Sequence, residues 1–133
     1  MGTNYYFRVK GADKIIDNVR KCSKFITHET LDYIESDLNK IHICKISGGW
    51  KPLFRATEHY CNVELLDNFY HDNKDGLEIV NEYGYILTWE KFRKTIVNQN
   101  KNGKTAEESF KELNDDNFYM DYAGYEWYDG EFW

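Results

Sequence analysis

The chain of 133 residues lacks the features that usually divide or anchor a protein. Its single proline, Pro52, leaves no proline-rich linker, so we expect one domain over residues 1–133. No apolar run approaches the roughly 20 residues of a membrane span, and the first residues lack the basic-then-apolar order of a signal peptide. We therefore expect a cytoplasmic protein without membrane contact.

Cysteine is also scarce, and the cysteines that occur do not form a recognisable set. Cys22, Cys44 and Cys61 are odd in number, and no two of them form a CxxC pair. A disulfide framework is not expected from this pattern, and reduced thiols in a cytosol are the default.

A basic excess is missing as well. The chain has 17 Lys and Arg against 23 Asp and Glu, which gives a net charge of −6. Six acids and no Lys or Arg lie in the acidic aromatic segment 114–133, so this segment carries the whole net charge. We expect no direct binding to nucleic acid through the net field, although an acidic protein can imitate nucleic acid.

Alternation of apolar and polar residues predicts strands over 4–10 and about 41–46, followed by a third strand near Leu53. Pro52 removes a ladder donor, which predicts an edge position or a bulge for that third strand. Residues 77–87 are typical of a hairpin with a glycine-containing turn.

Helical periodicity alternates with these strands. Apolar stripes predict helices that begin near Thr27, Asn62, Thr88 and Thr105, all of which are good capping residues, and another helix after Asp13. Residues 98–104 are polar and predict a mobile loop, and the segment from Asn117 predicts a further hairpin or an extended flap. The fold class expected is α+β, an antiparallel sheet built from hairpins with several amphipathic helices packed on one face.

The most reactive stretch is residues 42–50, HICKISGGW. Its lysine charge, its hydroxyl and its glycine amides suit an oxyanion, and its tryptophan suits a base. The expected ligand-binding residues are therefore His42, Lys45, Ser47, Gly48, Gly49 and Trp50. Strand alternation places His42 and Cys44 on one face and Lys45 on the other, unless the strand twists or bulges. An ordinary hairpin turn is the alternative.

Metal binding and catalysis find less support in the sequence. The pairs His42-x-Cys44 and His59-x-Cys61 offer zinc ligands, but their spacing is not that of zinc sites. A nucleophile at Cys44 or Ser47 lacks a recognisable elbow. We predict no catalytic residue, no metal and no cofactor. A small phosphoesterase or nucleotide-processing enzyme using His42 stays as an alternative.

Three segments resemble a family of small bacteriophage and prophage proteins: MGTNYY at the start, HICKISGGW in the middle, and GYEW with GEF near the end. The resemblance implies a phage-encoded accessory protein, a group in which inhibitors of host defence are common. It adds Asn4 and Tyr5 to the expected ligand-binding residues. Cys44 stands where the relatives usually carry glycine, which counts against a metal site and against close backbone approach there.

The leading hypothesis is a non-enzymatic protein of the host cytoplasm that counters a defence system by binding a nucleotide-type signal or another phosphate-bearing ligand. The alternative is an inhibitor of a host defence protein, acting as a nucleic-acid mimic or in the manner of anti-CRISPR proteins. Its interface is expected at Tyr125, Trp127, Glu131 and Phe132. About half of the aromatics of 114–133 are expected in the core. The sequence leaves the oligomeric state open, and a homo-oligomer is among the possibilities.

Overall fold

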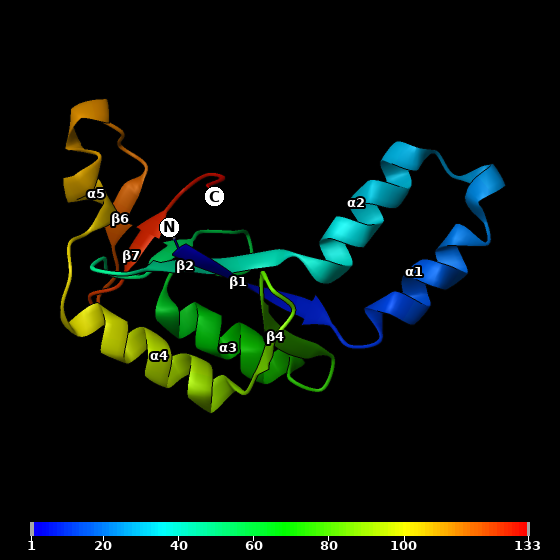
Figure 1. The fold of residues 1–133 in the computed structure, drawn as a ribbon, viewed down its shortest axis with the longest axis horizontal. Coiled ribbons are helices and arrows are strands. Elements are labelled where there is room, and N and C mark those ends of the chain that lie inside the picture. The colour runs from blue at the N-terminus through cyan, green and yellow to red at the C-terminus, as the bar shows by residue number, and fades with distance from the viewer. Residues whose placement is uncertain (1, 133) are drawn as a thin grey trace.

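A seven-stranded sheet organises the protein, in the order β5-β4-β1-β2-β3-β7-β6 (Figure 1). The computed structural model describes residues 2–132, without the side chain of Ser23, so Met1 and Trp133 of the expected domain lie outside it. The strands are β1 (Gly2–Val9), β2 (Ile41–Ser47), β3 (Leu53–Arg55), β4 (Leu77–Asn81), β5 (Ile86–Leu87), β6 (Phe118–Met120) and β7 (Glu126–Tyr128).

Within residues 2–132, five α-helices accompany the sheet: α1 (Ala12–Arg20), α2 (His28–Asn39), α3 (Val63–Asn73), α4 (Trp89–Lys101) and α5 (Ala106–Ser109). Short 3₁₀ turns follow α1 at Ser23–Phe25 and α5 at Lys111–Leu113. The mostly antiparallel sheet with these helices confirms the α+β class. Hydroxyl or amide side chains cap α2 to α5, as predicted, at Thr27, Asn62, Thr88 and Thr105.

The core lies between one face of the sheet and helices α3 and α4 (Figure 1). Its largest side chains are fully buried and come from β1, from β3 and the loop after it, from α4 and from β7, namely Phe7, Phe54, Tyr60, Phe92 and Trp127. Burying one such side chain contributes about 1.5–3 kcal/mol to the stability of the fold, so many of the aromatic residues serve to pack the core.

Helices α1 and α2 form an arm that projects away from the sheet (Figure 1). The arm consists of these two helices and the 3₁₀ turn that joins them. Ala12 and Ile16 are the buried residues of α1, and α2 has none among the described residues. The expected packing of helices on one face of the sheet therefore holds for α3 and α4, whereas the helices of the arm do not pack there. No helix among residues 2–132 is long and apolar enough to cross a membrane.

Two local predictions are wrong. Strand β3 lies inside the sheet between β2 and β7, because Pro52 stands just before Leu53, where the ladder begins, and its missing N–H is not needed there. Residues 98–104 are not a free loop, because α4 continues to Lys101 and Lys104 bonds the turn after β2.

The C-terminal segment forms the predicted hairpin, β6 with β7. Strand β7 also pairs with β3 in parallel, which the sequence did not indicate. This pairing places residues 126–132 beside the turn after β2, although the two segments lie far apart in the sequence.

Candidate functional site

A β-bulge in β2 decides which side chains share a face. Tyr5 pairs with Cys44 and Tyr6 pairs with His42, so Ile43 is the extra residue. Lys45 pairs with Asn4, two residues before Tyr6 in β1, so His42 and Lys45 share one face while Cys44 turns to the core. The expectation that alternation separates His42 from Lys45 is therefore wrong.

The face with Lys45 is the one that α3 and α4 leave uncovered, and it carries a cavity of about 430 Å³. Lys45, Ser47, Gly48 and Trp50 line one part of it, as the sequence predicted for a ligand site. Its volume lies within the range of small-molecule pockets, about 300–1,000 Å³. We define this cavity as the turn cavity.

Aromatic side chains from three other segments complete the turn cavity. Phe110 follows α5, Phe118 and Tyr128 come from the last hairpin, and Phe132 lies near the end of the chain. The Trp50 and Phe110 rings meet edge to face with centroids 5.6 Å apart. The walls are therefore aromatic, whereas the charged groups belong to Lys45, Lys51, Asp115 and Glu131.

Sequence reasoning missed several of these residues. The sequence predicted a short helix that carries Phe110 and Leu113 and indicated no ligand contact for either residue. They are 42% and 70% exposed and line the cavity instead. Lys51 also lines the cavity, and its position directly after Trp50 was the one indication of this in the sequence.

Residues of α4 and of the segment after it hold the turn that follows β2 by hydrogen bonds. The Gln99 side chain donates to the backbone oxygens of Ser47 and Trp50, both at 2.9 Å. The Lys104 amide donates to the Gly49 carbonyl at 3.0 Å. Gly49 has φ 78°, the left-handed conformation that glycine adopts without strain. The α4 end thus fixes the cavity wall in place before any ligand arrives. Gly49 itself does not line the cavity.

His42 shares this face of the sheet with Lys45, but its side chain is buried and does not line the turn cavity. Its Nε2 lies 2.9 Å from Asn4 Oδ1, and the Phe132 ring lies over it, with the two ring centroids 4.9 Å apart. Burial lowers its pKa to about 4, with help from the charges of Arg55 and Lys45. The imidazole is therefore neutral at pH 7.

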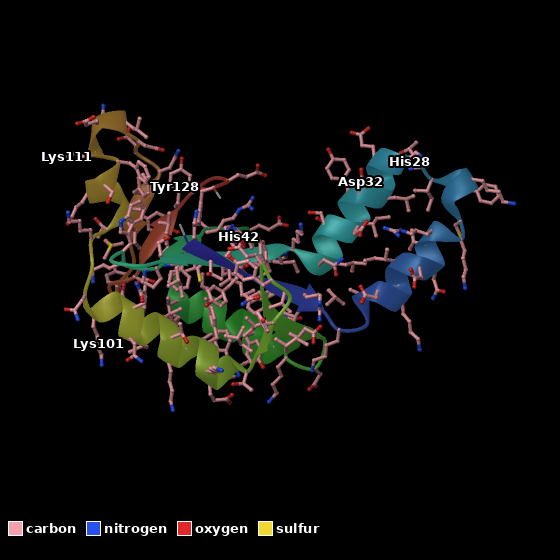
Figure 2. All side chains as sticks on the ribbon, viewed as in Figure 1. His28, Asp32, His42, Lys101, Lys111 and Tyr128 are labelled. Carbon is pink, nitrogen blue, oxygen red and sulfur yellow. The ribbon has the colours of Figure 1, made fainter. Side chains whose placement is uncertain are left out.

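Figure 2 shows His42 on the sheet, with Tyr128 toward the α5 end and His28 and Asp32 far out on the arm. Tyr5, the other residue expected from the opening motif, points to the core face and packs against Phe92 at 5.6 Å. Asn4 and Tyr5 therefore support the fold and do not contact the turn cavity.

The interface expected in the C-terminal segment is only partly exposed. Tyr125 is 8% exposed and Trp127 is fully buried, so neither offers surface to a partner, contrary to that expectation. Trp127 stacks on Phe54 because β7 joins the sheet there. Glu131 and Phe132 do lie at the surface and line the cavity.

Two acids of this segment, Glu126 and Asp121, stabilise the fold. The buried Glu126 carboxylate accepts from the amides of Ala106 at 2.6 Å and Glu107 at 3.0 Å, at the start of α5. Asp121 accepts from the Val63 amide and the Trp127 indole. An array of charges that imitates nucleic acid needs its carboxylates on the surface, and these two are turned inward.

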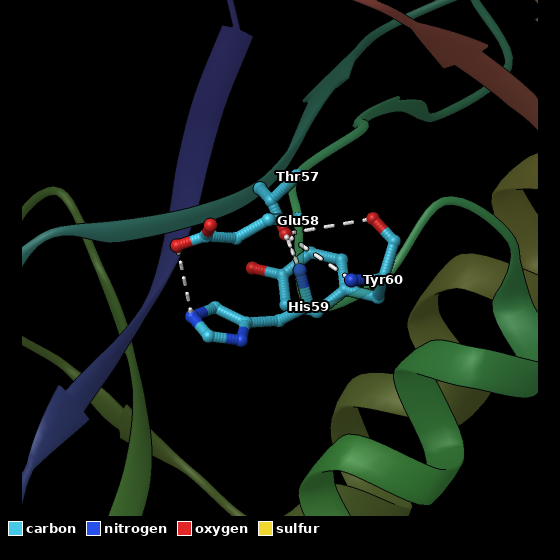
Figure 3. Close-up of polar contacts among 4 residues, drawn as sticks. All are labelled: Thr57, Glu58, His59 and Tyr60. Atoms are coloured by element: carbon cyan, nitrogen blue, oxygen red, sulfur yellow. Dashed lines mark hydrogen bonds and ion pairs between the residues drawn. The ribbon is translucent and has the colours of Figure 1, made fainter.

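The second His-x-Cys pair lies in a loop with a structural role (Figure 3). Thr57 Oγ1 accepts from the amides of His59 and Tyr60 at 3.1 and 3.2 Å, while His59 Nε2 lies 3.6 Å from Glu58. The loop thereby directs the Tyr60 hydroxyl to the His42 carbonyl at 2.9 Å.

The zinc interpretation fails on geometry. His42 and Cys44 point to opposite faces, and burial raises the pKa of the Cys44 thiol, which disfavours a thiolate ligand or nucleophile. Within residues 2–132, no group of three or more His, Cys, Asp and Glu side chains is placed to hold a metal ion.

Comparison with known proteins adds no family. No protein-family model, curated protein or solved structure matches the chain.

Proposed function

We propose that this protein binds a nucleotide-type small molecule in the turn cavity and does not transform it. The observation that carries the proposal is the composition of that cavity. It joins the lysine, hydroxyl and glycine turn of residues 45–48 to a wall of aromatic side chains from the other end of the chain. A phosphate and a base need these two kinds of surface side by side.

The charges of the cavity support an anionic ligand at the turn. Lys45 and Lys51 lie on the turn side, and the ammonium group of a lysine is a common partner for phosphate. Trp50, half-buried beside them, offers a stacking surface. The preformed turn adds affinity, because little backbone entropy is lost on binding.

Binding without catalysis agrees with the positions of the reactive groups. Cys44 faces the core, and Phe132 covers His42. Neither residue lines the cavity, so neither side chain reaches a ligand seated there.

The family resemblance extends the proposal to a biological role. A phage-encoded protein that holds a signal nucleotide in the host cytoplasm withdraws it from a defence system. The alternative, inhibition of a defence protein through the acidic segment, is less favoured because Glu126, Asp121, Trp127 and Tyr125 are engaged in the fold.

Thermal unfolding with a panel of adenine nucleotides and cyclic dinucleotides tests the proposal. We expect at least one nucleotide to raise the melting temperature, and chromatography to recover it intact. Lys45→Ala should weaken binding about ten- to hundredfold, the effect of losing one charged hydrogen bond. Lys94→Ala, on the exposed side of α4, removes the same charge elsewhere and should bind normally.

Three results would count against this function. Absence of binding across the panel removes it. A hydrolysed nucleotide points to the enzyme alternative, and equal weakening by Lys45→Ala and Lys94→Ala places the ligand outside the turn cavity.

A further inference from the structure

A third cation, Arg55, lies beside the turn cavity on the same face as Lys45. Lys45 pairs with Leu53 across β2 and β3, and Arg55 is two residues further along β3, so its side chain points to the same side. The charges of both Arg55 and Lys45 lower the pKa of His42, which places both cations near that ring. The positive end of the site therefore extends beyond the residues that line the cavity.

The carboxylate of Glu131 occupies this positive end. Its Oε1 lies 3.4 Å from Arg55 Nη2, and Glu131 and Lys45 line the same cavity. The Glu131 side chain is 73% exposed and that of Arg55 is 25% exposed. An ion pair open to water on one side contributes only about 0.2–1 kcal/mol, so an external anion displaces it at low cost.

Phe132 links this carboxylate to the rest of the site. Its ring lies between His42, at 4.9 Å, and the cavity that it helps to line. Tyr128 contacts the same ring edge to face, at 5.9 Å. Glu131 and Phe132 thus cover the positive end, and Glu131 places one negative charge there.

We propose that the ligand's anionic group replaces the Glu131 carboxylate at Arg55, beside Lys45, and that this group is a terminal phosphomonoester and not a phosphodiester. This inference rests on the proposed function and deepens it. A phosphodiester brings one negative charge, as the carboxylate does, so the exchange gains no charge. A phosphomonoester carries about −1.5 to −2 at pH 7 and presents oxygens that a guanidinium binds in pairs.

Isothermal titration of AMP and 3′,5′-cyclic AMP tests the proposal. Wild-type protein should bind AMP more tightly than cyclic AMP. Glu131→Gln should bind AMP about two- to fivefold more tightly, because the competing carboxylate is gone. Asp129→Asn is the matched control: it removes the same charge from the same exposed segment, away from Arg55, and should bind AMP like wild type.

A double-mutant cycle locates the effect at Arg55. Arg55→Gln should weaken AMP binding and reduce the preference over cyclic AMP. Adding Glu131→Gln in that background should produce less gain than it does in the wild type, because the two side chains act on each other.

The outcomes are distinct. Binding of AMP with equal affinities for Glu131→Gln and Asp129→Asn overturns the exchange and leaves the proposed function standing. Cyclic AMP bound as tightly as AMP overturns the phosphomonoester preference. If neither wild type nor any variant binds AMP or cyclic AMP, the proposed exchange at Arg55 is wrong. If no nucleotide of the whole panel binds, the proposed function is wrong as well.

Discussion

His42 should make the protein sensitive to acid. Its pKa falls from an ordinary 6.5 to about 4 in the folded state, mainly because the ring is buried. The folded state therefore binds the proton less well than the unfolded chain. This contribution to stability is complete above pH 6.5 and is lost as the pH falls through about 4. A difference of about 2.5 pKa units corresponds to about 3 kcal/mol between pH 7 and pH 4.

Urea unfolding of wild type and His42→Gln, at pH 7 and pH 4, measures this contribution. The carboxylates titrate in both proteins, so their contribution to the loss of unfolding free energy cancels when wild type is compared with His42→Gln. Wild type should lose about 3 kcal/mol more than His42→Gln between these pH values. Equal losses for wild type and His42→Gln would refute the buried placement of this ring beside Arg55 and Lys45.

Two further substitutions test the supports of the site. Glu126→Gln should destabilise the protein by about 1–3 kcal/mol in urea unfolding. The Ala106 and Glu107 amides donate to different oxygens of the carboxylate, and Gln places an NH₂ donor opposite one of them. A loss below about 0.5 kcal/mol would show that the carboxylate does not cap α5. Tyr60→Phe should cost about 1 kcal/mol, since its hydroxyl bonds the buried His42 carbonyl, whereas Tyr33→Phe on the exposed arm should cost nothing measurable. Equal costs for these two would contradict that bond.

Local chemistry explains what the sequence could predict. Thr27, Asn62 and Thr88 cap helices because a side-chain oxygen accepts from an amide three residues on, and this needs no distant partner. The glycine turn after β2 follows the same logic, since Gly49 adopts a positive φ. These features depend only on residues that are close in the sequence, so the sequence alone predicts them.

Long-range pairing explains the rest. The bulge at Ile43 arises from the register between β1 and β2, and alternation along β2 alone gives no sign of it. The parallel pairing of β3 with β7 buries Trp127, which the sequence also offered as an interface residue. That pairing also brings Tyr128 and Phe132 to the cavity, so half of the candidate site depends on a contact between distant segments.

The central claim, a nucleotide-type ligand in the turn cavity, is tested most directly by a ¹H–¹⁵N correlation titration of the labelled protein with AMP. We predict saturable shifts at the amides of Ser47 and Gly48, at the Trp50 indole and at Glu131, the residues that line the cavity, with none along the arm. Saturable shifts confined to the arm or to the far edge at β5, or an unchanged spectrum at millimolar AMP, would contradict it.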